Sequence, residues 1–454
     1  MKQLEQFLRR LDAAIVSTDV TQTTFHAYDA TNEFHYPEAV VRPRDSEELH
    51  QIVLSANEYH VPLFPRGAGT GFSGGSLAVD GGVVIDFLGL NKVLDLDEDD
   101  MLVRVQPGVV TLHLQKLVES HKLYFPPDPA SLKICTIGGN VAENAGGPHC
   151  LKYGVTRDYV LAIDGFTGDG RPFAAGKAIH KNRAGYDLRH LLIGSEGTLA
   201  VFSAFTLKLI PRPETRILFL AWFRAIHDAA AMVNQLLHRG IMPSSIEFMD
   251  EGSIKAVEQH AHMGLPTGFQ ALLLIEIDGR HDEMPLIQKR VEDCLSTSAS
   301  NIQVAHQADE QEKLWEVRRK ASPAMRQFGN KKANQDIVVP RKSIPTALDG
   351  LKHISQRHRI NVINFGHIGD GNIHVNIMYD GNNPDDCQRA ELAVHDLFDL
   401  VNSLGGSISG EHGIGLAKKK HLPRNIDTTS YDLMRAIKRD FDPHGILNPR
   451  KIFL

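Results

Sequence analysis

The feature that most constrains this chain is the uneven distribution of its glycines. Most of the 38 glycines fall in three stretches, residues 67–82, 138–197 and 366–415. Glycine lets a backbone take positive φ angles and approach a ligand closely, so clusters of this kind usually mark functional loops. Around these stretches, helical and strand patterns alternate without a repeat, which predicts an α+β or α/β chain, with α+β preferred.

Length and composition exclude several classes of protein. With 454 residues, 42% hydrophobic, the chain can bury a large core, and at roughly 150 residues per domain it suggests two or three domains. A formal charge of -6 gives no overall basic field, so we expect no nucleic-acid partner. Four cysteines are too sparse for a disulfide framework. The longest apolar run, Ile217 to Phe223, is too short to cross a bilayer, and we expect a cytoplasmic protein that could be peripheral at the inner membrane.

Helix and strand signals indicate where the domains divide. Leu49, Ile52, Val53 and Ala56 follow a helical period behind the capping residue Asp45. Similar stripes lie near residues 114–118, 232–237 and 394–401, and strand-like runs cover residues 83–87, 102–106, 199–210 and 271–277. The prolines at 211 and 213 interrupt both patterns. We therefore predict a first domain over residues 1–212, a second over 213–412 and a helical C-terminal segment over 413–454 that returns to the first domain.

The first glycine loop, PRGAGTGFSGGS at residues 65–76, can bind an anion. Its N–H groups can form a nest for a phosphate or pyrophosphate, and Thr70 and Ser73 add hydroxyl donors. Gly69, Gly71 and Gly74 also match a dinucleotide fingerprint, but a strand follows at Val83 where a nicotinamide-binding fold would place a helix. A flexible glycine loop without a ligand is the alternative.

Two further loops extend this theme. Residues 125–147 combine prolines with Asn140 and Asn144, which could hydrogen-bond a heteroaromatic ring, and GSEG at 194–197 precedes a long strand. With PPDPAS, TIGGNVAENAGGP and IGSEGTLAVF, the chain resembles the flavin-binding domain of the vanillyl-alcohol oxidase / p-cresol methylhydroxylase superfamily. The resemblance implies FAD, bound noncovalently because the first loop has no His or Cys. The residues that it implies for FAD binding are Arg66, Gly67, Ala68, Gly69, Thr70, Gly71, Ser73, Gly74, Pro127, Asp128, Ser131, Thr136, Gly138, Gly139, Asn140, Asn144, Gly147, Gly154, Glu196, Gly197 and Asn448.

The second half carries a candidate metal site and an acid–base pair. Strand alternation from Ile373 places His374 and Asn376 on one face, and His367 on the preceding turn can fold back toward them. Glu411, within SGEHGIG, could complete a His-His-Glu site for a divalent metal such as Zn, Mn or Fe. The neighbouring His412 would be free to act as a base. Structural loop histidines and an exposed charged turn are the alternatives.

HIGDGNIH and SGEHGIG together resemble the C-terminal domain of FAD-linked D-2-hydroxy-acid dehydrogenases, a group with D-lactate, glycolate and D-2-hydroxyglutarate enzymes. The resemblance covers about residue 36 to the end. It implies that His367, His374 and Glu411 bind the metal and that His412 is the catalytic base. It also implies that substrate contacts Arg318, Ser322, Lys332 and Asn376, with Arg319, Lys320 and Arg341 as alternatives for the carboxylate contact.

From these residues we expect a dehydrogenase that oxidises a D-2-hydroxy acid, D-lactate being the first candidate, by metal-assisted proton abstraction and hydride transfer to FAD. Electrons would leave to a quinone, a cytochrome or an electron-transfer flavoprotein, and homodimerisation stays open. The alternatives are a D-2-hydroxyglutarate, D-malate or glycolate enzyme, an FAD alcohol oxidase, and a flavoprotein subunit of an electron-transfer complex.

Overall fold

The computed structural model describes residues 2–454, which form two compact units. Unit 1 contains the chain up to Gly147, residues 154–212 and residues 411–454, and unit 2 contains residues 148–153 and 213–410. The boundary at 212/213 coincides with the prolines at 211 and 213. Two details differ from the domains expected from the sequence: residues 148–153 are part of unit 2, and the later boundary lies at 410/411 instead of 412/413.

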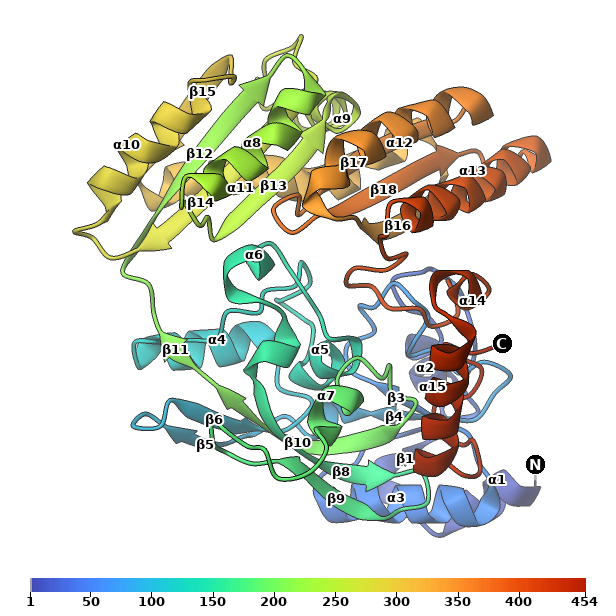
Figure 1. Ribbon diagram of the computed structural model, residues 1–454. Helices are drawn as coiled ribbons and strands as arrows, with labels where there is room; N and C mark the ends of the chain where they lie inside the picture. The colour runs from blue at the N-terminus through green and yellow to red at the C-terminus, as the bar shows by residue number, and fades with distance from the viewer. Residues whose placement is uncertain (1) are drawn as a thin grey trace. The chain divides into compact units, whose positions relative to one another are not determined.

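Unit 1 is built on three sheets (Figure 1). Their strand orders are β1-β2-β4-β3, β5-β6-β10-β8-β9 and β11-β7, and β2 and β3 both run parallel to β4. The strands are β1 Val16–Ser17, β2 Ala39–Val41, β3 Leu63–Arg66, β4 Val83–Asp86, β5 Val93–Asp97, β6 Leu102–Val105, β7 Leu123–Tyr124, β8 Val160–Thr167, β9 Pro172–Gly176, β10 Ala200–Lys208 and β11 Ile210–Pro211. The helices are α1 Lys2–Arg9, α2 Val20–Phe25, α3 Ser46–Tyr59, α4 Thr111–Ser120, α5 Ile137–Glu143, α7 Leu188–Leu192, α14 Leu422–Asn425 and α15 Thr428–Phe441.

Helix α3 illustrates how local sequence signals and burial combine in unit 1. The Asp45 side chain accepts the N–H of Glu48 at 2.9 Å, which satisfies an otherwise unpaired donor of the first turn. Leu49, Ile52 and Val53 are fully buried in the core that α3 shares with β2, β3 and β4. The helix predicted from the apolar stripe is therefore present, and its buried face anchors the sheet that leads into the first glycine loop.

Unit 2 is built on one seven-stranded sheet of order β15-β12-β14-β13-β17-β18-β16. Each neighbouring pair of strands in this sheet is antiparallel. The strands are β12 Thr215–Phe223, β13 Ser245–Asp250, β14 Ala271–Gly279, β15 Asn301–Ala305, β16 Lys331–Val338, β17 Asn361–Gly366 and β18 Asn372–Tyr379. The helices are α6 Cys150–Tyr153, α8 Ile226–His238, α9 Glu251–Ala261, α10 Met284–Leu295, α11 Ala308–Ala324, α12 Ile344–His358 and α13 Pro384–Ser403.

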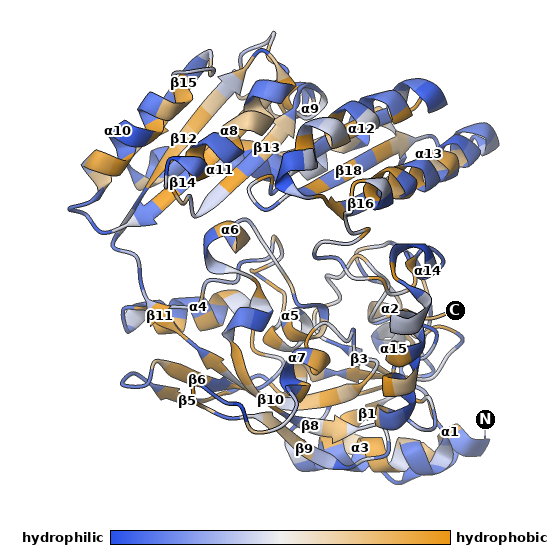
Figure 2. Ribbon diagram, in the orientation of Figure 1, coloured by the Kyte–Doolittle hydropathy of each residue, from blue (hydrophilic) through white to orange (hydrophobic). Residues whose placement is uncertain are grey.

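The two faces of this sheet differ in character. Helices α8, α10, α12 and α13 lie along one face in Figure 1, and their outward sides are largely hydrophilic in Figure 2, whereas the strands are hydrophobic. Helices α9 and α11 pack on the other face, over an apolar cluster that includes Leu220, Leu274 and Met249. On β16 and β18 this second face turns polar, because Asp336 pairs with His374 and Asn334 with Asn376. The polar end of this otherwise apolar face is therefore a candidate binding or catalytic site.

No helix among residues 2–454 combines the length and apolar character needed to span a bilayer.

Candidate functional site

The first glycine loop leaves β3 and reaches β4 without an intervening helix, as the sequence predicts. Gly69 and Gly74 have φ angles of 68° and 75°, a region that favours glycine. Gly71 is different, since a Cβ atom added there would meet nothing within 4 Å. The fold itself does not require glycine at position 71, so its absent side chain leaves open space above the loop.

This loop borders a cavity of about 60 Å³ whose lining residues all belong to unit 1. Six residues expected to bind FAD line it: Arg66, Gly67, Thr136, Gly138, Gly139 and Gly197. The sequence did not single out the remaining lining residues, Pro65, Phe87, Pro107, Ala142, Ala200, Val201 and Phe202, which are mostly apolar. An apolar cavity with glycine edges and one arginine suits a flat heteroaromatic group that carries an anionic tail.

Other residues expected to bind FAD make hydrogen bonds or close contacts to protein groups around this cavity. Asn140 donates to Thr111 Oγ1 at 2.8 Å, and Asn144 Oδ1 accepts the backbone N–H of Arg157 at 2.9 Å. Asn448 donates to the carbonyl oxygens of Gly75 and Glu196 at 2.8 and 2.7 Å. Gly147 packs so closely on Asp128 that a Cβ would lie 2.5 Å from its carbonyl oxygen. These contacts within the protein already account for asparagine or glycine at these four positions, whether or not a ligand also contacts them.

The remaining predicted FAD positions lie on the same loops. Ala68 and Thr70 follow Gly67 in the first loop, and Ser131 Oγ lies 3.5 Å from Thr70 Oγ1. Pro127 accepts a hydrogen bond from Gln115 at its carbonyl oxygen, at 3.0 Å. The hydroxyl of Ser73 is buried and has no hydrogen-bond partner among the described residues. Gly154, with φ at 79°, packs against the Asp158 carboxylate.

Cys135 is buried beside this region and does not resemble a reactive thiol. Burial raises the pKa of the Cys135 thiol, and Thr111 Oγ1 lies 3.3 Å from its sulfur. A thiol with a raised pKa is a poor nucleophile at neutral pH.

In unit 2, the two histidines expected to bind a metal face one another. His374 is on β18, and His367 lies in the turn between β17 and β18. Their Nε2 atoms are 3.4 Å apart and the two rings are nearly perpendicular, at 85°. In a tetrahedral zinc site with metal–nitrogen bonds of about 2.05 Å, two ligand nitrogens lie about 3.3 Å apart. The Nε2 atoms therefore have the separation of two ligands of one small cation.

A buried carboxylate stands behind each imidazole. Glu247 Oε1 is 2.6 Å from His367 Nδ1, and Asp336 Oδ1 is 3.8 Å from His374 Nδ1. The hydrogen bond to Glu247 makes His367 Nδ1 the N–H donor and leaves a lone pair on His367 Nε2. This lone pair faces His374 Nε2 at 3.4 Å, so the arrangement favours a cation or a shared proton between the two nitrogens.

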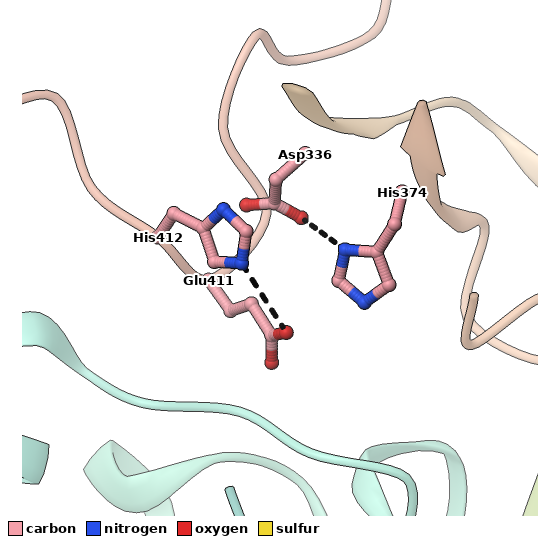
Figure 3. Close-up of side chains that lie close together, drawn as sticks. All are labelled: Asp336, His374, Glu411 and His412. Carbon is pink, nitrogen blue, oxygen red and sulfur yellow. Dashed lines mark ion pairs between the residues drawn. The ribbon is translucent and has the colours of Figure 1, made fainter. Parts of the chain in front are cut away.

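Asp336 also holds the chain segment that leads to Glu411. Its Oδ2 accepts the backbone N–H of Gly410 at 2.9 Å, and Glu411 follows directly, one Cα–Cα step of about 3.8 Å further on. Within unit 2 the carboxylate of Asp336 is paired with His374, and within unit 1 Glu411 is paired with His412 (Figure 3). Asp336 lies on the Nδ1 side of His374, which makes it a better orienting group than a ligand.

His412 is held within unit 1. Its ring lies 4.7 Å from the ring of Phe72, which belongs to the first glycine loop, and its Nε2 is 3.9 Å from Glu411 Oε1. The residues just after it are fastened by Glu196, whose two carboxylate oxygens accept the N–H groups of Ile414 and Gly415 at 2.8 and 2.7 Å. The predicted base therefore lies on a loop that is hydrogen-bonded to one of the loops expected to bind FAD.

Arg318 lies on α11, close to the histidine pair in unit 2. Its Nε donates to Glu247 Oε2 at 2.6 Å, and its guanidinium lies 4.6 Å from the centre of the Phe365 ring. Burial alone would raise the pKa of Glu247, but the charges and hydrogen bonds of His367 and Arg318 lower it to about 2. Glu247 thus joins a predicted substrate contact to a predicted metal ligand.

The other predicted substrate contacts lie on the polar end of the same sheet face. Asn376 is fully buried on β18, and its Oδ1 has no hydrogen-bond partner among the described residues. Lys332, on β16, donates to the hydroxyl of Ser322 at 3.4 Å, and burial lowers the pKa of its ammonium, with a contribution from Arg326. Arg319 and Lys320, the alternatives on α11, pair with the acidic residues Glu312 and Glu316 of their own helix.

The sequence did not single out Glu247 and Asp336. One signal was available for Glu247, which stands between Ile246 and Phe248 in an apolar strand. A charged residue there must be paired when it is buried. Its partners come from distant parts of the chain and could not be read from the strand itself.

The comparisons with known proteins identify the family of the chain. Residues 212–452 match the family model for FAD linked oxidases, C-terminal domain, and residues 37–176 match that for an FAD binding domain. The chain is 39% identical over 430 residues to the glycolate oxidase subunit GlcD of Bacillus subtilis, covering 94% of this chain and 92% of that one. It is 34% identical over 428 residues to a D-lactate dehydrogenase of Anaerostipes hadrus, covering 92% and 89%.

A third relative is a D-2-hydroxyglutarate dehydrogenase of Stutzerimonas stutzeri, 33% identical over 457 residues and 96% of each chain. Among solved structures, p-cresol methylhydroxylase with substrate bound superposes with a TM-score of 0.82 at 16% identity, over 99% of this chain and 95% of that one. This confirms the predicted vanillyl-alcohol-oxidase-type fold. The chain therefore belongs to the FAD-linked oxidases, as an FAD-linked oxidoreductase of the 2-hydroxy-acid dehydrogenase group.

Proposed function

We propose that this protein is an FAD-dependent dehydrogenase that oxidises a D-2-hydroxy acid to the 2-oxo acid with the help of a divalent metal, D-lactate being the first candidate. The observation that carries this proposal is the pair of facing imidazoles, His367 and His374, with Arg318 fastened to the same carboxylate as His367. A site of this kind can hold a cation and an anionic carboxylate side by side.

The residues of each unit fit the group they are proposed to hold. In unit 1, the open space at Gly71 and the cavity beside Gly138 and Gly139 suit FAD. In unit 2, the facing Nε2 atoms of His367 and His374 are nitrogen donors of the type that Zn, Mn or Fe accepts, and Glu411 is the proposed oxygen donor. When bound, FAD would accept a hydride from the substrate, and the metal would lower the pKa of the substrate hydroxyl.

The side chains of the protein would then have the following roles in the reaction. Arg318 holds the substrate carboxylate, since its planar guanidinium can form two parallel hydrogen bonds. His412 takes the hydroxyl proton at Nε2, so that loss of a hydride from C2 would complete the 2-oxo acid. A quinone, a cytochrome or an electron-transfer flavoprotein would serve as the final electron acceptor. Asn376 contacts the substrate through its unpartnered amide oxygen.

A second candidate substrate class is a dicarboxylic hydroxy acid such as D-2-hydroxyglutarate or D-malate. The observation that favours it is Lys332, whose ammonium pairs with no carboxylate among the described residues. The relatives include both monocarboxylate and dicarboxylate enzymes. A second carboxylate would provide the charge partner that Lys332 lacks.

The test is anaerobic flavin bleaching of the purified protein by D-lactate, L-lactate, glycolate, D-malate and D-2-hydroxyglutarate, with and without a chelator. We expect rapid bleaching by a D-acid, its loss on chelation and its recovery with added metal. His412→Asn should retain FAD and slow bleaching by about 100-fold or more, the usual contribution of a general base. Bleaching by D-acids that survives chelation would contradict the metal role, and absence of bleaching by every acid would contradict the activity.

A further inference from the structure

Glu247 is a buried carboxylate to which the proposed reaction assigns no role of its own. It lies on β13, is 1% exposed, and its two oxygens serve different partners. Oε1 is 2.6 Å from His367 Nδ1, and Oε2 is 2.6 Å from Arg318 Nε. We propose that Glu247 is a positioning residue that couples metal binding to hydroxy-acid binding, an inference that rests on the proposed function.

The contact with His367 determines which of its nitrogens can bind a metal. Because Glu247 accepts the Nδ1 proton, the lone pair of the neutral ring is on Nε2, the nitrogen that faces His374. Without a carboxylate acceptor, the proton can move to Nε2 and the ring can rotate. Carboxylates in this position also make the imidazole a stronger ligand.

The contact with Arg318 determines how its guanidinium is presented. Glu247 holds the Nε edge, and Phe365 lies against the guanidinium at 4.6 Å from the ring centre. The outer NH1 and NH2 groups are thereby directed as a fork, the geometry that binds a carboxylate through two hydrogen bonds. Loss of the Glu247 charge would leave a buried guanidinium without its counter-ion and free to swing.

A purely structural role is the alternative, and Glu276 provides the comparison. Glu276 is on the neighbouring strand β14 and is 2% exposed, and it accepts from Trp315 Nε1 at 3.0 Å and lies 2.8 Å from His149 Nε2. Burial raises its pKa, but His149, Arg216 and Trp315 lower it to about 2, the same value as for Glu247. The two carboxylates therefore have similar burial and charge, but only Glu247 contacts the predicted site residues.

The experiment compares Glu247→Gln with Glu276→Gln in the full-length, FAD-loaded protein. After chelation, Zn²⁺ and, separately, Mn²⁺ are titrated back, and the apparent Kd of the hydroxy acid is measured by flavin bleaching. For Glu247→Gln we expect metal affinity to fall by about 10–100-fold, as for other carboxylates behind a histidine ligand. We expect the Kd of the acid to rise about tenfold, since one charge-assisted hydrogen bond to the arginine is lost. For Glu276→Gln both values should stay within about twofold of wild type.

Several outcomes separate this inference from the proposed function. Equal effects of the two variants, or no effect of Glu247→Gln on either affinity, would overturn the role of Glu247. If Glu247→Gln does not fold, Glu247→Asp keeps the charge at shorter reach and should weaken both affinities together. A change in one affinity alone would contradict the coupling. A wild-type protein that neither binds metal nor is bleached by any hydroxy acid would instead contradict the proposed function.

Discussion

Lys332 is the residue at which substrate choice and stability can be tested together. Burial, with the like charge of Arg326, lowers the pKa of its ammonium below the usual value. Because the folded pKa lies below the unfolded one, the charged ammonium destabilises the fold at neutral pH, and this cost shrinks only as pH rises through the folded pKa. A charged Lys332 that lowers the stability of the fold in this way indicates a role in binding an anionic ligand.

Replacing Lys332 by Met should therefore affect catalysis more than folding. We expect Tm to stay the same or rise, since a partly buried charge is removed, and kcat/KM for D-2-hydroxyglutarate to fall by about tenfold. Activity with D-lactate should change by no more than about twofold. Lys331→Met, one residue earlier and exposed, is the matched control. Equal losses with both acids would show that Lys332 does not contact a second carboxylate.

Single residues differ in how far the sequence alone could select them as candidates. His367 and Glu411 could be selected because glycines flank them, and His374 because strand alternation places it on one face with Asn376. Glu247 and Asp336 could not, because their roles depend on the strand order β13-β17-β18-β16, which joins segments over 100 residues apart. Asn140 and Asn144 were expected to contact the flavin ring; in the structure the Asn140 side chain donates to Thr111 and the Asn144 side chain accepts from Arg157.

At the scale of elements, the loop after His412 is held in place by hydrogen bonds to the loop that precedes β10. Glu196, at the start of that loop, accepts two N–H groups from Ile414 and Gly415, and a Cβ on Gly413 would lie 2.6 Å from Glu143 Oε2. Burial, together with the nearby Glu196 and Asp29 carboxylates, raises the pKa of Glu143 well above its usual value. The Glu196 carboxylate thus holds the loop after His412 in place, while the raised pKa of Glu143 favours its neutral form.

Glu196→Gln should loosen this loop without emptying the flavin site. The amide keeps one acceptor but turns an NH₂ toward a backbone N–H, so at least one charge-assisted hydrogen bond is lost. We expect the rate of flavin reduction at saturating substrate to fall by about 10–100-fold and the FAD content to stay near that of wild type. Glu143→Gln, which puts a neutral amide in place of a carboxyl whose raised pKa favours the neutral acid, should change the rate by about twofold or less. Loss of FAD in Glu196→Gln would assign Glu196 to cofactor binding instead.

Elements were predicted better than their arrangement. The helical stripes became α3, α4, α8 and α13, and the glycines at 240 and 405 follow α8 and α13 with positive φ angles. The strand expected over residues 199–210 is divided into β10 and β11, because β11 leaves the five-stranded sheet to pair with β7. Periodicity reports which face of an element is buried but not which neighbour buries it.

At the scale of the whole molecule, the end of the chain completes unit 1. Leu447 bridges to Leu63 at the start of β3, and the Lys451 ammonium donates to the carbonyl oxygens of Gly74 and Leu77 at 2.6 and 2.8 Å. These carbonyls belong to the loop expected to hold the FAD pyrophosphate and to the turn that follows it. Burial lowers the pKa of Lys451 to about 7, an effect that Asp29 and Glu196 partly offset.

Lys451 should therefore make FAD binding depend on pH. An anionic pyrophosphate favours the charged ammonium, so the FAD affinity of the wild type should decrease as pH rises through about 7, where the free protein loses this proton. The apoprotein should behave oppositely and gain stability between pH 7 and about 10.5, because the unfolded chain holds more protons there. Lys451→Met should remove both trends and weaken FAD binding at pH 6.5 by about tenfold, whereas Lys92→Met, at an exposed position, should change neither. Fluorescence titration of FAD from pH 6 to 9 measures the first trend and thermal unfolding of the apoprotein the second; a pH slope that persists in Lys451→Met would assign the titration to another group.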